Sequence, residues 1–314
     1  MTRLATALTI GLVTPLISVG LPVYNGERYL AGAIEALLAQ DLDDFELLIS
    51  DNASDDATAA IATAYAERDA RIRYHRNQRN LGLAGNFNRL VELARGRYFK
   101  WAAHDDWHPP QTLRACTDAL EREPAAVLCG SAVAIMDEDG QVFDEWHPSA
   151  DLTSPAAHVR FHRLIWTMGE THPLFAVMRT DALRRTSLIQ GYVGTDRVLL
   201  AQLVLMGPFL QLPEILHYYR QPRLLQAPPP PETTGAQVSV ILNPANRGRL
   251  RFRTWRLCSE HLGVVARAPV APWHKPSLAA DVLARFGGRD SRRMAAEVYH
   301  AGRVLVSRAR SGTV

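Results

Sequence analysis

Residues 16–56 decide the fold, and they read LISVGLPVYNGERYLAGAIEALLAQDLDDFELLISDNASDD. The uncharged, largely apolar run Leu16–Val23 predicts a buried strand. Gly26–Gln40 predicts a helix, because its apolar side chains recur three and four positions apart. Phe45–Ser50 is again short and largely apolar, and it predicts a second strand. The stretch therefore indicates a strand–helix–strand unit.

The same alternation continues to residue 136 with short links. We expect a helix capped by Ser54 and running to Arg68, a strand at Ile72–His75, a helix at Leu83–Ala94, a strand at Tyr98–Ala103, a helix opened by Pro109 and a strand at Ala126–Met136. Short apolar strands that alternate with helices predict an α/β fold with a mostly parallel sheet covered on both faces. Ligands bind such sheets beyond the carboxyl ends of the strands.

After residue 140 the alternation loosens. We expect helices at His158–Met168 and Asp196–Met206, with extended segments at Leu174–Met178 and Phe209–Tyr219. A proline-rich stretch, APPPPETTG at residues 227–235, predicts an exposed loop or linker.

Charge is distributed unevenly along the 314 residues, although the net charge is only +3. From Asn246 onward, fourteen Lys and Arg residues accompany four Asp and Glu residues, so this segment carries about +10 and the preceding body about −7. A basic segment suits an anionic partner such as a membrane surface, nucleic acid or a phosphate-bearing substrate. No nucleic-acid reader motif accompanies the charge, so we expect no nucleic-acid partner.

Cysteine usage and the first residues bound the cellular setting. Cys116, Cys129 and Cys258 form no CxxC, so we expect buried thiols in a reducing compartment. Leu4–Leu21 is uncharged and about as long as a bilayer span. It contains Pro15 and runs into the first strand, so we favour a short leader over a membrane span or a signal peptide.

Polar side chains follow three of the expected strands. Tyr24-Asn25 follows the first, Asp51-Asn52 the second, and His104-Asp105-Asp106 the fourth. Adjacent carboxylates repel, so a chain places them in a solvated turn or beside a cation. Here they could cap the helix opened by Pro109, but convergence of three strand ends favours a ligand site.

Neither common phosphate-binding device is present. No GxGxxG follows the first strand, and no GxxxxGK[ST] occurs in the chain. A bound phosphate would then need another counter-charge. Mg²⁺ or Mn²⁺ on Asp105 and Asp106 would supply it, because these ions commonly bridge carboxylates and phosphates.

Two stretches carry a family resemblance. PVYNGERYLAGAIEALLAQDLDDFELLISDNASDDAT (residues 22–58) and NLGLAGNFNRLVELARGRYFKWAAHDDW (residues 80–107) resemble the glycosyltransferases of family 2, which have the GT-A fold. The matching positions of the first stretch are Pro22, Tyr24, Asn25, Gln40, Phe45, Glu46, Asp51, Asn52, Ser54 and Asp56. The resemblance covers residues 15–220. It implies a Rossmann-like, mostly parallel sheet flanked by helices, followed here by a basic helical C-terminal extension.

The resemblance implies an inverting transfer of a sugar from a nucleoside-diphosphate sugar to an acceptor hydroxyl, in bacterial-type polysaccharide or glycolipid assembly. The expected parts of the chain are a leader at 1–14, a nucleotide-sugar-binding half at 15–140, an acceptor-binding half of the same domain at 141–222, a linker at 223–245 and a basic helical extension at 246–314. The implied partners are a nucleotide-sugar donor and a saccharide or lipid-linked acceptor.

The resemblance also implies roles for individual residues. Nucleotide-binding roles fall on Pro22, Val23, Tyr24, Asn25, Asp51, Asn52, Asn80, Gly82, Arg89 and Asp105. Metal-binding roles, for Mn²⁺ or Mg²⁺, fall on Asp105 and Asp106. The family commonly has D-x-D-D at this strand end, whereas this chain has Ala103 in place of the first aspartate. That departure puts full metal dependence in question.

GYVGTDRVLLAQLVLMG (residues 191–207) resembles the family segment that carries the catalytic base, and Asp196 matches that base. An inverting transfer needs one carboxylate to take the proton of the attacking hydroxyl. His104, His172, His217 and Arg220 are the expected contacts to the acceptor or the diphosphate.

Two other classes stay open. A sugar nucleotidyltransferase would share the sheet, but it should carry a glycine-rich basic turn that PVYNGERYL lacks. A nucleotide-sugar-binding pseudoenzyme is suggested by Ala103, whereas Asp196 argues against it. Arg residues mixed with Phe252, Trp255 and Leu257 suggest contact with an anionic membrane. The alternatives are a solvated helix packed on the catalytic domain and a contact in a homo-oligomer. We expect a cytoplasmic protein, peripheral on the inner membrane face.

Overall fold

The structure is a computed structural model that describes residues 14–167, 172–221, 244–246 and 252–310, without the side chains of residues 246, 302 and 304–310. The expected leader therefore lies outside the described residues except for residue 14. The expected linker lies outside them except for residues 244–245.

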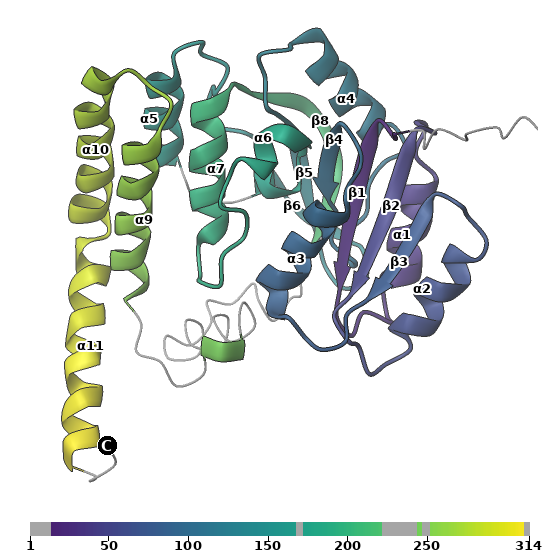
Figure 1. Cartoon of the computed structure of the whole chain (residues 1–314), viewed down its shortest axis with the longest axis horizontal. Coiled ribbons are helices and arrows are strands. Elements are labelled where there is room, and N and C mark those ends of the chain that lie inside the picture. Colours follow the sequence, from purple (N-terminus) through teal and green to yellow (C-terminus); the bar gives the residue numbers. More distant parts are fainter. Residues whose placement is uncertain (1–13, 168–171, 222–243, 247–251, 311–314) are drawn as a thin grey trace, which may run out of the picture.

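One sheet of eight strands forms the centre of the molecule (Figure 1). The strands are β1 Ile17–Val23, β2 Phe45–Asp51, β3 Ile72–Arg76, β4 Tyr98–Trp101, β5 Leu128–Met136, β6 Val142–Trp146, β7 Val177–Arg179 and β8 Phe209–Arg220. Their order is β3-β2-β1-β4-β7-β5-β6, and β8 pairs in parallel along β5. The pairs β1–β2, β2–β3 and β1–β4 are parallel, whereas β7 is antiparallel to β4 and β5, and β6 is antiparallel to β5. The predicted mostly parallel sheet is confirmed.

Helices cover both faces of the sheet. The helices of the described residues are α1 Leu30–Leu38, α2 Thr58–Ala66, α3 Gly82–Leu93, α4 Thr112–Arg122, α5 Ala157–Thr167, α6 Thr180–Arg184, α7 Thr195–Met206, α9 Arg253–Arg267, α10 Lys275–Ala284 and α11 Ser291–Arg310. The last three stand at one end of the molecule, beyond α5 and α7 (Figure 1). Short 3₁₀ turns lie at η1 His172–Phe175, η3 Pro244–Asn246 and η4 Pro272–His274, and a π-helical turn, η5 Arg285–Arg289, joins α10 to α11.

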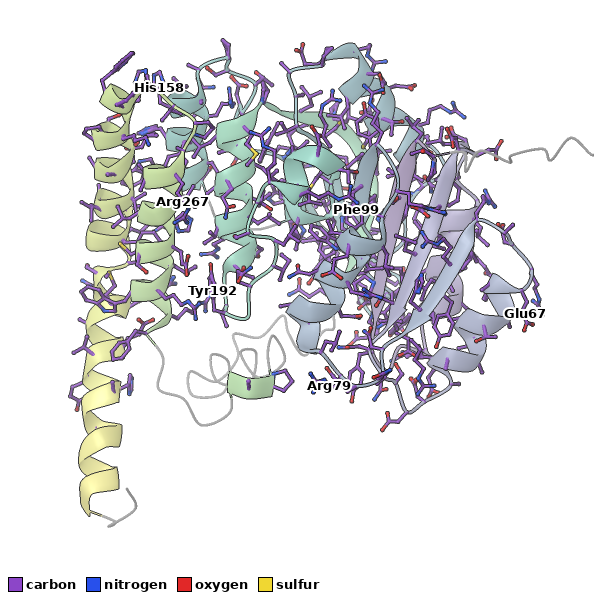
Figure 2. The ribbon with its side chains drawn as sticks, in the orientation of Figure 1. Glu67, Arg79, Phe99, His158, Tyr192 and Arg267 are labelled. Atoms are coloured by element: carbon purple, nitrogen blue, oxygen red, sulfur yellow. The ribbon has the colours of Figure 1, made fainter. Side chains whose placement is uncertain are left out.

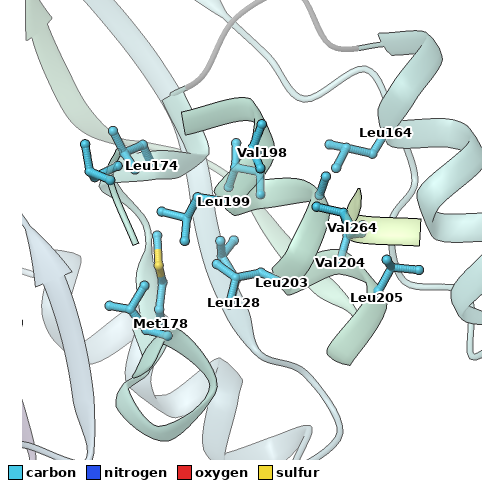
Figure 3. Packing of buried hydrophobic residues seen from close by; sticks show 14 of the residues in the cluster. Leu128, Leu164, Leu174, Met178, Val198, Leu199, Leu203, Val204, Leu205 and Val264 are labelled. Carbon is cyan, nitrogen blue, oxygen red and sulfur yellow. The ribbon is translucent and has the colours of Figure 1, made fainter. Parts of the chain in front are cut away.

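Two apolar cores lie on the two faces. In β2, Leu48 contributes to one core and its neighbours Leu47 and Ile49 to the other, because successive side chains of a strand point to opposite faces. The helices α1, α2 and α4 pack in one core, and α3 with α5–α7 and α9–α10 packs in the other. Figure 3 shows Leu128 of β5 among Leu199 and Leu203 of α7, which ties the second half of the sheet to the helical end of the molecule.

Several expected boundaries are wrong for local reasons. The first helix begins at Leu30 instead of Gly26, and the second at Thr58 instead of near Ser54. Ser54 does not cap a helix, because its hydroxyl accepts the Asn25 N–H. The expected extended segment Leu174–Met178 divides into the η1 turn and β7, and the exposed strand β6 was not predicted.

The C-terminal extension is helical, as expected, in α9–α11. All three cysteines are buried free thiols. Within the described ranges, no helix is both long enough and apolar enough to cross a bilayer.

Candidate active site

The turns that follow β1 and β2 are joined by hydrogen bonds. The Asn25 backbone N–H donates to the Ser54 hydroxyl at 3.0 Å, and the Asp55 N–H donates to the Asn25 side-chain carbonyl at 3.1 Å. Asn25 has a φ of 51°, a left-handed value that asparagine tolerates. Pro22 is buried within β1, whereas the neighbouring Tyr24 is 47% exposed. The Tyr24 ring is therefore free to pack on a ligand at this edge.

A fully buried carboxylate ends β2. Asp51 Oδ1 accepts the Ser54 backbone N–H at 2.8 Å, and Oδ2 accepts the Tyr74 hydroxyl at 2.9 Å. The Arg76 Nε lies 3.6 Å from the same Oδ2. Burial and the bond to Asp51 raise the pKa of Tyr74, so its proton stays in place. Asp51 is thus held in one orientation with lone pairs to spare.

Asn52 organises the loop between β3 and α3 from inside. Its Nδ2 donates to Asn80 Oδ1 at 2.9 Å, and its Oδ1 accepts the Leu81 N–H at 2.8 Å. Its own N–H donates to the Val23 carbonyl at 2.8 Å. Gly82 has a φ of 75° and donates its N–H to Asn80 at 2.8 Å. Asn52 is 3% exposed, so it shapes the loop, while Asn80 is exposed to a ligand.

Arg89 lies on α3, beside the loop that follows β3. It is exposed and forms a 3.2 Å ion pair with Glu92 on the next turn of α3. The two line an open cleft of about 650 Å³ beside the β3–α3 loop, together with Arg76 and Arg79. Arg89 therefore belongs to the rim of the loop that Asn52 holds.

The two adjacent aspartates have different surroundings. Asp106 is 3% exposed, and its Oδ2 lies 2.7 Å from Nε2 of the buried His217 on β8. Its Oδ1 accepts the Arg220 N–H at 2.9 Å. The Asp105 side chain is about one-third exposed, with His104 Nδ1 4.0 Å away. Asp105 is thus the more available of the two carboxylates.

Burial and the charge of Asp106 raise the pKa of Asp105, while His104 opposes this shift. The His104 ring packs over the first turn, since a Cβ added at Gly26 would lie 2.6 Å from its Cδ2. A cation beside Asp105 would relieve the repulsion between the two carboxylates.

Arg220 links the turn that carries Asp105 and Asp106 to the residues that follow β5. Its Nε donates to the Asp105 carbonyl at 2.9 Å, and Nη1 donates to the Asp137 and Glu138 carbonyls at 2.8 and 3.0 Å. The guanidinium carbon also lies 4.6 Å from the centroid of the Tyr29 ring. These bonds give Arg220 a structural role in positioning Asp105.

Aromatic rings lead away from the aspartate pair. The Tyr219 ring lies 5.4 Å from His172, whose ring lies 5.2 Å from Trp146. Burial, then Asp106 and Asp105, raise the pKa of Tyr219, which places its phenol near the pair. Burial and the charge of His217 lower the pKa of His172 to about 4, so its ring is neutral at pH 7.

Sequence reasoning missed Lys100, Trp146 and Tyr219. Lys100 is 2% exposed, donates to the Phe175 carbonyl, and has its pKa lowered by burial to about 8. With His217 and Trp146 it lines an internal cavity of about 20 Å³, room for roughly one water. A single lysine within an otherwise apolar strand could have indicated that Lys100 is a buried polar residue near the site. Nothing in the local sequence distinguished Trp146 or Tyr219 from other aromatic residues.

Asp196 lies in the first turn of α7, half-buried. The turn before it packs on α9: a Cβ on Gly194 would lie 2.9 Å from Leu257 Cδ1, and the Arg256 guanidinium lies 4.1 Å from the Tyr192 ring centroid. Figure 2 shows Tyr192 on the same lower side of the view as Arg79, which follows β3. In the described part of the chain, no hydrogen bond or ion pair joins Asp196 to the aspartate pair.

A divalent ion at this strand end would have few protein ligands. The described residues contain no group of three or more His, Cys, Asp and Glu side chains arranged to hold a metal. Mg²⁺ and Mn²⁺ are commonly held by one or two carboxylates, with substrate phosphates and water completing the shell. Asp105 fits that arrangement, and both oxygens of Asp106 already accept protein hydrogen bonds.

Comparison with solved structures places the fold. TarS of S. aureus, solved with UDP, superimposes with a TM-score of 0.60 at 17% identity, over 86% of this chain and 71% of that one. A mannosyltransferase of Pyrobaculum calidifontis, solved with GDP-Man and Mn²⁺, gives a TM-score of 0.51 at 15% identity, over 96% and 84%. These likenesses confirm the expected GT-A type of fold.

Proteins similar in sequence to this chain are also glycosyltransferases by name. The uncharacterized glycosyltransferase MJ1057 of Methanocaldococcus jannaschii is 33% identical over 136 residues, 43% of this chain and 47% of that protein. The uncharacterized glycosyltransferase EpsJ of Bacillus subtilis is 31% identical over 158 residues, 48% and 46% of the two chains. The chain thus matches these relatives over about half of their length. Residues 18–186, more than half of this chain, match the model of glycosyl transferase family 2, so the chain belongs to that family.

Proposed function

We propose that this chain is an inverting glycosyltransferase that moves a sugar from a nucleoside-diphosphate sugar to an acceptor hydroxyl in polysaccharide or glycolipid assembly. The observation that carries the proposal is the pair of acidic strand ends on one sheet edge. Asp51 is fixed at the end of β2, and Asp105 stands partly exposed beyond β4. Solved relatives of the fold carry UDP, UDP-GlcNAc or GDP-Man, which supports a nucleotide-sugar donor.

The nucleoside would lie between Tyr24 and the Asp51–Asn52 turn. The exposed Tyr24 ring offers a stacking face. Asp51 is 0% exposed, so its remaining lone pairs would meet donors of a base or ribose once the adjoining Arg76 side chain, itself 49% exposed, moves aside. The exposed Asn80 would meet the ligand from the loop that Asn52 holds.

Asp105 would hold the divalent ion, Mn²⁺ or Mg²⁺, between the protein and the diphosphate. When bound, the ion would neutralise charge on the departing diphosphate. Asp106 would orient His217 instead of reaching the ion, since its oxygens face β8. The Mn²⁺ in the mannosyltransferase structure supports a metal at this kind of site.

Asp196 would serve as the base that takes the proton of the acceptor hydroxyl. It lies at the N-terminal end of α7, where the helix dipole favours a negative charge. The rings of Tyr219, His172 and Trp146 would border the acceptor, which would be a saccharide or a lipid-linked saccharide. We also propose that the protein works in the cytoplasm at the inner membrane face, where its basic C-terminal extension would meet anionic lipid.

A donor panel tests the proposal. Thermal unfolding would be followed with UDP-, GDP-, dTDP- and CDP-sugars, each with Mn²⁺, Mg²⁺ or EDTA. A ligand at a hundred times its dissociation constant adds about 2.7 kcal/mol of stability, so one nucleotide class should raise the melting temperature by several degrees. Release of free nucleoside diphosphate from that donor should then follow. No shift with any donor in any metal would contradict the proposal.

A nucleotide-sugar-binding pseudoenzyme is the second candidate, favoured by Ala103 and by the engaged oxygens of Asp106. Donor binding without nucleotide release, in a chain whose Asp196→Asn variant behaves like the wild type, would favour it.

A further inference from the structure

The exposed charges of the C-terminal extension all have one sign. Between residues 252 and 303, the exposed charged residues are arginines, which we call the arginine surface: Arg253, Arg256, Arg267, Arg289, Arg292, Arg293 and Arg303. None of the four acidic residues in this described segment is exposed. An anionic partner would therefore meet seven exposed arginines and only partly exposed carboxylates on this segment, among them Glu260 at 33% and Asp281 at 20%.

The acidic residues are turned to internal contacts. Asp290 accepts Arg285 at 2.5 Å, Asp281 meets His162 of α5 at 2.8 Å, Glu297 accepts the Thr254 N–H at 2.8 Å, and Glu260 lies 3.6 Å from Arg256. Asp281 and Glu297 thus join helices, whereas Glu260 and Asp290 pair locally with Arg256 and Arg293 of the arginine surface. The other five arginines of that surface have no ion pair among the described residues.

Large apolar side chains stand among the arginines. The exposed fractions are 48% for Trp255, 76% for Trp273, 55% for Leu283, 52% for Val298 and 65% for Tyr299. These five belong to twelve large hydrophobic residues that are exposed in the whole described chain. With Phe252 at 42%, the extension carries six of these twelve residues, and such a concentration favours an interaction surface.

The extension has a separate inner side that is already covered. Leu257, Val264, Leu278 and Val282 are buried in the core shared with α5 and α7. α9 and α10 lie at one end of the molecule, and α11 continues beyond the end of α9 (Figure 1). Within the described part of the chain, the outward sides of α10 and α11 face no other helix or strand.

We propose that the arginine surface docks on a lipid bilayer with anionic headgroups. Arginines with interspersed Trp, Leu and Tyr on amphipathic helices fit the boundary between headgroups and acyl chains. A symmetric contact with a second copy would place arginine against arginine, which is unfavourable. The inference concerns docking alone and does not depend on the transferase reaction.

Co-sedimentation with vesicles tests the proposal. The full chain is expected to bind vesicles of 60% phosphatidylcholine and 40% phosphatidylglycerol, to leave pure phosphatidylcholine unbound, and to release in high salt. Arg292→Gln combined with Arg303→Gln should weaken the partition about tenfold or more, since each arginine near the surface contributes about a factor of five. Neither arginine has an ion pair among the described residues, so the fold should persist.

A matched control uses arginines far from the extension. Arg68→Gln combined with Arg122→Gln removes the same charge from exposed positions of the body and should leave binding within twofold. Trp273→Ser should weaken binding without changing the net charge. Equal binding to neutral vesicles, no binding to anionic ones, or equal losses in both arginine variants would overturn the proposal. So would a concentration-dependent dimer, seen by light scattering, that the Arg292/Arg303 variant abolishes.

Discussion

At the residue scale, the two adjacent aspartates differ: Asp106 is buried and has a structural role, whereas Asp105 is partly exposed. Asp106→Asn should lower stability by about 1–3 kcal/mol, because it disturbs a buried charge-assisted bond to His217. Asp105→Asn should leave the melting temperature unchanged or slightly raised, because the side chain is partly exposed and the change removes the repulsion from Asp106. Thermal unfolding of both variants without ligand checks this, and equal melting temperatures would contradict it.

The hydroxyl of Tyr74 fixes the carboxylate that we place at the nucleoside. Tyr74→Phe removes that hydroxyl and should cost about 1 kcal/mol, with weaker donor binding because Asp51 loses one of its anchors. Tyr65→Phe is the matched control, since its hydroxyl bonds Glu35 in an exposed position. Denaturant unfolding and donor titration measure the two effects. Equal donor affinity in both variants would argue against Asp51 as a nucleoside contact.

At the element scale, the junction of α7 and α9 positions the proposed base. Gly194 has a φ of 89°, and an added Cβ would press on Leu257. Gly194→Ala should cost about 1–2 kcal/mol in stability and lower the rate of nucleotide release more than the affinity for donor. Gly287→Ala, where a Cβ meets no atom within 4 Å, is the control. An unchanged rate of nucleotide release in Gly194→Ala would mean that Asp196 is not the base or that this turn does not position it.

The buried His261 makes α9 sensitive to acid. Burial lowers the pKa of His261 to about 4, and its Nε2 has no partner among the described residues. Between about pH 6.5 and pH 4, His261 binds a proton in the unfolded chain but not in the folded chain. The contribution of the neutral His261 to the free energy of unfolding is therefore complete above pH 6.5 and is lost as the pH falls toward 4.

Between pH 7.5 and pH 5 the free energy of unfolding should therefore fall in both chains, and the fall should be about 1–2 kcal/mol smaller in the His261→Leu variant than in the wild type. The stability of each chain would be measured by denaturant unfolding at both values. His300→Leu, at an exposed position of α11, should keep the wild-type slope. If His261→Leu also keeps it, the acid sensitivity lies elsewhere.

The strands of the first half were predictable because burial on both faces makes them continuous apolar runs. Phe45–Ser50 was expected and Phe45–Asp51 is observed. The starts of the first two helices were not predictable, because Asn25 and Ser54 form hydrogen bonds between two turns that are distant in sequence instead of capping a helix. Propensity records only local preferences, whereas these bonds depend on which strands are neighbours.

The second half of the sheet was less readable. β6 is exposed and polar, so it lacks an apolar pattern, and β7 is only three residues long. The candidate site shows the same limit. The acidic strand ends followed from motif and position, but the bond between Asp106 and His217 joins residues that lie 111 positions apart. The parallel pairing of β8 with β5 and an antiparallel bridge between Trp107 and Tyr218 bring His217 to that edge.

At the scale of the whole molecule, opposite charges are separated along the chain. The body carries about −7 and the segment from Asn246 about +10, and the packed acids of the extension leave its arginines outside. α9 joins the two parts, because it packs on the turn before Asp196 and also carries part of the arginine surface. A docked extension would thus hold the proposed base near the bilayer, where a lipid-linked acceptor would be found.

The most direct test of the central claim is calorimetric titration of the nucleoside-diphosphate sugar chosen by the thermal panel, with Mn²⁺ and with EDTA. The wild type should bind with Mn²⁺ and weaken at least tenfold in EDTA. Asp105→Ala should bind weakly in both conditions and keep the wild-type melting temperature. If Asp105→Ala binds the donor as the wild type does and with the same response to Mn²⁺, the metal and the diphosphate do not lie at this strand end.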